Sequence, residues 1–200
     1  MSALTDEAAP AWPDVRSWGS TAAERRLVYP CDRHLPVHDE ALYRAVGVEA
    51  SPALLFRWLC QLRAAPYSYD WIDNLGRPSP RHLTPGLDAL EVGQVVMGFR
   101  LVEFEPDRHL TLCGHPLGRL FGTYAATYLV LPSGPERCRL VVKLLAAYPR
   151  PALLRVPMRA LVPLADLVMM RKQLLTLKAL AERDASAGTD HTGGDGPPGG

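Results

Sequence analysis

A period of two in the side chains of the second half of the chain is the feature that most limits how it can fold. The run 138–148 carries apolar side chains at every second position, namely Leu140, Val142, Leu144, Ala146 and Tyr148. Arg139 and Lys143 occupy positions between them, on the opposite side. A strand with one apolar face is typical of an antiparallel sheet that is covered on that face.

Three other segments of this half show the same period of two. They lie at 94–102, 110–113 and 121–131. The turn-forming sequence EPDR separates the first two, and PSGP precedes the strand at 138–148. Such turns join neighbouring strands of one sheet, and we predict hairpins at both places. A further strand is predicted at 43–49, before the first helix.

Two segments have the period of a helix instead. Ser51 is a suitable N-cap and Pro52 suits the first helical position. The apolar positions that follow are Leu54, Leu55, Trp58, Leu59 and Leu62, and Pro66 then blocks the helix.

The second helix is predicted at the end of the chain. From Pro163 onward a wide apolar face is formed by Leu164, Leu167, Val168, Met170, Leu174, Leu175 and Leu177. Much of the rest of the circumference is polar, with Asp166, Lys172, Gln173 and Glu182. We expect Pro157 and Pro163 to break or kink any helix that runs through 152–162.

This order of elements predicts an α+β fold. A curved antiparallel sheet can wrap around the long C-terminal helix, since each offers one wide apolar face. Such an arrangement often leaves a cavity between helix and sheet, which is where a ligand would bind.

Composition divides the chain into one domain and two tails. Residues 1–26 have no lasting period, and residues 185–200 are rich in Gly and Pro, so both are expected to be disordered. The folded domain is expected at 27–184. The net charge of +1 gives no field that would attract nucleic acid. No CxxC pair and no apolar leader are present, which predicts a cytoplasmic protein with reduced thiols.

Common catalytic and cofactor motifs are missing from the sequence. It contains no GxSxG, P-loop, GxGxxG or HExxH pattern. Cys31 lies near His34 and His38, but no second cluster completes a tetrahedral zinc site. We therefore expect neither a metal nor a cofactor.

The apolar stretch 151–170 raises the question of a membrane. Arg155, Arg159 and Asp166 interrupt it, together with two prolines, which argues against a spanning helix. Transient contact of an amphipathic helix with a membrane surface stays open.

Three stretches resemble bacterial members of the SRPBCC superfamily, and they read ALYRAVGVEASPALLFRWLCQLRAAPYSYDWIDNLGRPSPR, LEVGQVVMGFRLVEFEPDRHLTL and DLVMMRKQLLTLKALAE. This superfamily includes START-related lipid-transfer domains, polyketide cyclases/dehydratases and pollen-allergen-like proteins. The resemblance covers about residues 29–183. It implies the helix-grip fold, a curved antiparallel sheet around a long C-terminal helix with a hydrophobic cavity. It implies no catalytic residues, because members with a similar PYSYDWIDN segment mostly lack an assigned activity.

The stretch 66–80 (PYSYDWIDNLGRPSP) concentrates ionisable and aromatic side chains between the first helix and the sheet. If 69–75 is a helical turn, Asp70 and Asp73 share a face and Asn74 lies beside Asp70. Two close carboxylates can raise the pKa of one of them and create a general base. Alternatively, each carboxylate caps the turn or pairs with a neighbouring arginine.

The aromatic residues Tyr67, Tyr69 and Trp71 also have two interpretations. They can anchor the loop by packing on the core, or line the mouth of the cavity, since tyrosine and tryptophan combine a flat apolar body with a polar tip.

Three more residues are candidates for ligand binding. Arg171 falls within the apolar arc of the last helix, so we expect it either to pair with Asp70 or, second, Asp73, or to extend its head to water. Tyr124 and Tyr128 share one strand face, but alternation alone does not decide whether that face is the inner one.

These features favour binding of a hydrophobic or amphipathic small molecule in an internal cavity. One alternative is a cofactor-independent enzyme of the cyclase or dehydratase type, using a carboxylate or tyrosine of residues 67–77. Another is a protein-interaction module. The sequence leaves the ligand and the oligomeric state open.

Overall fold

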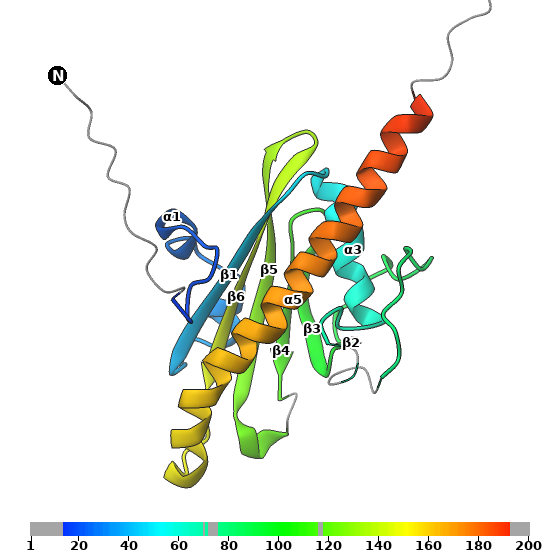
Figure 1. The fold of residues 1–200 in the computed structure, drawn as a ribbon. Helices are drawn as coiled ribbons and strands as arrows, with labels where there is room; N and C mark the ends of the chain where they lie inside the picture. The colour runs from blue at the N-terminus through cyan, green and yellow to red at the C-terminus, as the bar shows by residue number, and fades with distance from the viewer. Residues whose placement is uncertain (1–13, 70, 72–75, 116–117, 193–200) are drawn as a thin grey trace, which may run out of the picture.

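A curved sheet and one long helix dominate the computed structural model, which describes residues 14–69, 71, 76–115 and 118–192 (Figure 1). Within these residues the sheet has six antiparallel strands in the order β1-β6-β5-β4-β3-β2. The strands are β1 (Glu40–Val48), β2 (Val95–Val96), β3 (Phe99–Glu105), β4 (His109–Gly114), β5 (Thr123–Gly134) and β6 (Arg137–Ala147). Helix α5 (Ala152–Thr192) runs across one face of the sheet (Figure 1). This arrangement is the predicted α+β helix-grip fold.

The shorter helices lie before and between the strands. They are α1 (Ala22–Arg25), α2 (Cys31–His34), α3 (Pro52–Cys60) and the 3-10 turns η1 (Gln61–Arg63) and η2 (Arg119–Phe121). Helix α3 begins as predicted, because the Ser51 side chain accepts a hydrogen bond from the Leu54 amide and Pro52 follows the cap. No helix in the described part of the chain is long and apolar enough to cross a membrane.

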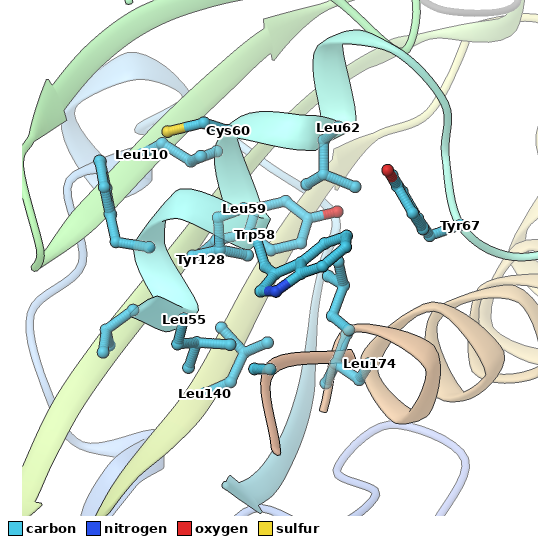
Figure 2. Close-up of a cluster of buried hydrophobic side chains, with 14 of the residues drawn as sticks. Leu55, Trp58, Leu59, Cys60, Leu62, Tyr67, Leu110, Tyr128, Leu140 and Leu174 are labelled. Atoms are coloured by element: carbon cyan, nitrogen blue, oxygen red, sulfur yellow. The ribbon is translucent and has the colours of Figure 1, made fainter. Parts of the chain in front are cut away.

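The main core lies where α3 and the C-terminal half of α5 meet the sheet (Figure 2). Its central side chain is Trp58, which is fully buried and donates its indole N–H to Asp184 at 3.1 Å. The buried leucines around it include Leu55, Leu59, Leu62, Leu140, Leu174 and Leu177. The apolar positions that predicted helix α3 are therefore the ones that hold it to the rest of the fold.

The predicted strand at 94–102 is interrupted by a tight turn. Met97 and Gly98 both have positive φ, 51° and 80°, and they join β2 to β3. Two consecutive residues with positive φ form the turn that best matches the twist of a hairpin. The alternation of side chains continues across this turn, so the sequence pattern did not reveal it.

Helix α5 excludes one of the two effects predicted for the prolines, a break. It runs without interruption through Pro157 and Pro163. A proline removes one helical hydrogen bond, and packing can compensate for that loss. Pro163 is buried, and its carbonyl accepts a hydrogen bond from Arg44.

The face that α5 turns to the sheet also differs from the predicted one. Leu164 and Val168 are exposed, whereas Leu174 and Leu177 are buried as expected. Gln173, expected on the polar side, is buried.

The N-terminal segment from residue 14 onward is part of the fold rather than of the tail expected at 1–26. The carbonyls of Arg16 and Trp18 accept hydrogen bonds from the amides of β1, so this segment covers the outer edge of the sheet. Gly19 has positive φ, and a Cβ there would meet the carbonyl oxygen of Ala45 at 2.0 Å. Only glycine permits this close approach. At the other end α5 extends to Thr192, beyond the boundary expected at 184.

Candidate functional site

A cavity of about 230 Å³ lies between the sheet and the middle of α5. Its side chains come from four strands, from α5, and from two connecting segments. They are Pro66, Ser68, Met97, Phe99, Leu112, Ala126, Tyr128, Val142, Leu144, Asp166, Met169, Met170 and Gln173. The wall is therefore mainly apolar, with a small number of polar groups.

The alternation of β5 and β6 places the wall residues side by side. Ala126 and Tyr128 are two apart on β5, and Val142 and Leu144 are two apart on β6. The register pairs Ala126 with Leu144 and Tyr128 with Val142. All four side chains consequently lie on the sheet face that α5 crosses.

Tyr128 and Gln173 form the first polar group in this cavity. The Tyr128 hydroxyl donates to Oε1 of Gln173 at 2.7 Å, and Nε2 of Gln173 donates to the Pro66 carbonyl at 2.6 Å. Burial raises the pKa of Tyr128, so it stays a neutral phenol. The pair links the sheet, α5 and the 66–68 segment through one chain of hydrogen bonds.

Asp166 and Arg44 form the second polar group. Arg44 extends from β1, is 1% exposed, and has Nη2 at 2.8 Å from Oδ2 of Asp166. It also donates to the carbonyls of Tyr43 and Pro163. Burial raises the pKa of Asp166 to about 6, although the Arg44 charge opposes this rise. The cavity wall thus contains a buried carboxyl group whose pKa lies above its ordinary value.

A second cavity of about 300 Å³ lies towards the N-terminal end of α5. It is lined by Phe99, Tyr124, Leu144, Val162, Ala165, Asp166 and Met169. Four of these residues, Asp166 among them, also line the first cavity, so the two spaces are neighbours beneath one helix. Tyr124 contributes its ring, while its hydroxyl donates to the Phe121 carbonyl at 3.1 Å.

The structure places Tyr124 and Tyr128 on the inner face of the sheet, the choice that alternation left open. Tyr67 has a different position from the one expected at a cavity mouth. It is buried against Trp58, with ring centroids 6.0 Å apart in an edge-to-face contact, and it lines neither cavity (Figure 2). Its geometry matches the packing interpretation.

The rest of the 66–80 stretch contributes little to the described walls. Tyr69 is half-buried and Trp71 is 75% exposed, and neither lines the two cavities. Asp70, Asp73 and Asn74 lie outside the described residues. Among the described residues of this stretch, Pro66 and Ser68 line the first cavity.

Arg171 is exposed and not within a buried arc, which agrees with the alternative in which its head extends to water. Its guanidinium carbon is 5.6 Å from the centre of the Trp18 ring. Because the Arg171 side chain is not buried, its charge needs no carboxylate partner. The buried ion pair of this helix is formed by Asp166 with Arg44 instead.

Sequence reasoning missed Asp166, Arg44 and Gln173 as site residues. A signal was present, because Asp166 is the single acidic residue between 150 and 181 and it sits in an apolar stretch. An isolated charge in such a stretch needs a buried partner or an exit to water. The helical pattern alone also allowed the Asp166 side chain to reach water. Only the position of β1 relative to α5 shows that Asp166 pairs with a buried arginine instead.

The chain is similar in structure to several solved proteins, but its sequence identity to them is low. No protein-family model matches the chain, and no curated protein matches it. The di-domain aromatase/cyclase BexL from the BE-7585A biosynthetic pathway is 12% identical, with a TM-score of 0.48 over 72% of this chain and 47% of that one. The chain thus spans about half the length of that di-domain protein.

Two other solved structures match this chain over nearly their whole length. Protein jhp0584 from Helicobacter pylori is 19% identical, with a TM-score of 0.49 over 78% of this chain and 95% of that one. The Zhui aromatase/cyclase from Streptomyces sp. R1128 is 13% identical, with a TM-score of 0.40 over 78% and 99%. Similarity at this level says nothing about activity. The chain's own antiparallel sheet and long C-terminal helix form the helix grip, the fold that the resemblance to the SRPBCC superfamily implies.

Proposed function

We propose that this protein binds a hydrophobic or amphipathic small molecule between its sheet and helix α5. The observation that carries the proposal is the apolar cavity with its two polar groups, Tyr128–Gln173 and Asp166–Arg44. Burial of apolar ligand surface would supply most of the affinity, and the polar groups would fix its orientation.

The size of the cavities restricts the ligand. The first cavity, about 230 Å³, is smaller than the roughly 300–1,000 Å³ of a typical small-molecule site. A ligand must therefore be small or extend into the second cavity, which shares Phe99, Leu144, Asp166 and Met169 with the first. We expect a flat or elongated apolar body with at least one hydroxyl or carbonyl group, which can reach Tyr128 or Asp166.

Native mass spectrometry of the protein purified from its own host tests this proposal. We expect a mass above that of the chain, which returns to the chain mass after denaturation because the ligand is held without a covalent bond. A chain that carries no small molecule, in a protein that also binds no apolar fluorescent probe, would contradict the proposal.

Ala126→Phe is the variant expected to abolish ligand binding, since Ala126 lines the first cavity and a phenyl ring would fill that cavity. We expect the co-purifying mass to disappear while the circular dichroism spectrum stays that of a folded protein. Ala179→Phe makes the same chemical change at an exposed position of α5 and should retain the ligand.

Acid–base catalysis of the cyclase or dehydratase type is a second candidate, favoured by Asp166. Asp166 is a wall residue of both cavities, and its pKa is raised to about 6, the range suited to proton transfer at neutral pH. Asp166 would then take the role that the sequence suggested for residues 67–77. If the protein is a dehydratase, Asp166→Asn should co-purify with a molecule one water heavier than the one on the original chain. Identical masses would favour binding alone.

A further inference from the structure

Helix α5 leaves a row of large apolar side chains in solvent. Leu153, Val156, Leu161, Leu164 and Val168 are all exposed, from 86% at Leu153 to 47% at Val168. We call these five residues the α5 stripe. Single exposed apolar residues are ordinary, but five along one helix form a patch of the kind that marks an interaction surface.

The α5 stripe lies on the side of the helix that faces away from the cavities. Leu153 and Leu164 are eleven residues apart, which is close to three helical turns, so they share a side. Leu161 and Val168 flank the same line at spacings of three and four from Leu164. The cavity residues Met169 and Gln173 lie on the other side. The N-terminal half of α5 is thus apolar on both sides, and the sheet covers only one of them.

The charged side chains within residues 150–181 are mostly positive. Residues 150–181 contain six Lys and Arg and one acid, Asp166. Asp166 faces the cavities and is paired with Arg44, so it does not offset the cations on the outer side. Arg150 is exposed just before the helix, and Arg171 and Lys172 are exposed just after the stripe. An apolar row with cations at both ends is complementary to a surface that is apolar inside and negatively charged outside.

We infer that the α5 stripe docks this protein on the surface of a membrane that contains anionic lipids. The leucine and valine side chains would enter the boundary between headgroups and acyl chains, and Arg150, Arg171 and Lys172 would contact the negative headgroups. The inference does not depend on the proposed ligand, because it uses the outer side of α5.

A second copy of the chain fits the α5 stripe less well. In an antiparallel pair of stripes Arg150 of each copy would face Arg171 and Lys172 of the other, and in a parallel pair each cation would face its equivalent. Both arrangements bring like charges together while the apolar rows meet, which opposes association.

Co-sedimentation of the full chain with lipid vesicles tests the inference. We expect binding to vesicles of phosphatidylcholine mixed with phosphatidylglycerol, weaker binding to phosphatidylcholine alone, and release as the salt concentration rises. The double variant Leu161→Gln with Leu164→Gln should weaken binding at least about tenfold, because two leucines would no longer enter the lipid. Lys172→Gln alone should weaken it about fivefold on anionic vesicles.

Val28→Gln is the matched control, since Val28 is 89% exposed and lies outside α5. It should bind vesicles as the original chain does, and all variants should keep the original unfolding midpoint. Three results would overturn the inference: no binding to anionic vesicles, equal loss with Val28→Gln, or a dimer in sedimentation velocity that the double variant converts to a monomer. The last result would assign the α5 stripe to a second copy instead.

Discussion

The two halves of helix α5 do different work in this molecule. From 172 to 187 the helix buries Gln173, Leu174, Leu177, Leu180 and Ala181 against α3 and the sheet. From 152 to 171, where every residue is described, Pro163 is buried and the side chain of Asp166 is 9% exposed, and the other residues are half-buried or exposed. The C-terminal half, 172–187, is an anchor with close packing. The N-terminal half, 152–171, covers two cavities and carries an exposed apolar row.

This difference shows how one helix can both hold a fold together and form a ligand site. Close packing at the C-terminal half fixes the helix on the sheet through Trp58 and its leucine neighbours (Figure 2). The N-terminal half is then held over the sheet by fewer contacts, and the Arg44–Asp166 ion pair is the central one. Space beneath this half remains open because its inner residues do not fill it.

Loss of the buried ion pair should have the largest effect on stability. Asp166→Leu leaves the Arg44 guanidinium buried without the carboxyl group that it contacts at 2.8 Å, and arginine cannot lose its proton at accessible pH. We expect the free energy of unfolding at pH 7 to fall by about 3–5 kcal/mol, measured by urea denaturation.

The double variant Arg44→Met with Asp166→Leu separates pairing from packing. It removes both charges and should recover most of the lost stability. If the double variant is as unstable as Asp166→Leu, the N-terminal half of α5 is held by shape rather than by the ion pair.

Leucine truncation compares the two halves directly. Leu177→Ala in the anchor should lower the free energy of unfolding by about 2–5 kcal/mol, because Leu177 is fully buried and a cavity would remain. Leu164→Ala in the exposed row should change it by less than about 0.5 kcal/mol. Similar losses in urea denaturation would show that Leu164 is covered in solution, which would contradict the description of this half.

The pH dependence of stability isolates Asp166. Because its pKa is raised from 3.8 to about 6 on folding, the folded chain binds a proton more tightly than the unfolded chain does. Its contribution is therefore most favourable below pH 4, falls by about 2–3 kcal/mol between pH 4 and pH 6, and is constant above that.

The control for this profile is Asp166→Asn, which cannot titrate. The fall between pH 4 and pH 6 should be absent from its profile. The pKa of Glu103 is lowered to about 2, first by hydrogen bonding from Arg33, so its stabilisation is lost below about pH 4.5. Both chains contain Glu103, and its contribution therefore cancels in the difference between the two profiles. A difference between the two profiles that is flat from pH 4 to pH 6 would contradict the assignment.

The strands and the anchor of α5 could be predicted from the sequence because their signals are local. Alternation in 138–148 and the Ser51-Pro52 cap each depend on neighbouring residues. Combining them predicted the α+β arrangement, and the resemblance to the SRPBCC superfamily implied the helix grip. The turn at Met97–Gly98 was hidden, because a two-residue turn preserves the alternation on either side.

The site was harder to predict because its polar groups meet across long separations in sequence. Arg44 and Asp166 are joined only when β1 lies beside α5, and Tyr128 and Gln173 only when β5 does. The aromatic and acidic stretch at 66–80 attracted attention by composition, yet Tyr67 packs on Trp58 and Trp71 points to solvent. Composition identified a loop rich in aromatic and ionisable residues. The orientation of α5 about its own axis determines which of its residues line the cavity.

A smaller effect than loss of the ion pair or of Leu177 is expected for the hydrogen bond that joins Gln173, near the start of the C-terminal half of α5, to the sheet. Tyr128→Phe keeps the ring in the cavity wall but leaves Oε1 of Gln173 without its donor at 2.7 Å. We expect the free energy of unfolding to fall by about 1 kcal/mol in urea denaturation, the usual value for one buried hydrogen bond. Tyr124→Phe removes a longer bond of 3.1 Å to the Phe121 carbonyl, in a less buried place, and should cost less. If Tyr124→Phe is the more damaging of the two, Gln173 is not the residue that couples the anchor to the cavity, and the boundary between the halves lies nearer the start of the helix.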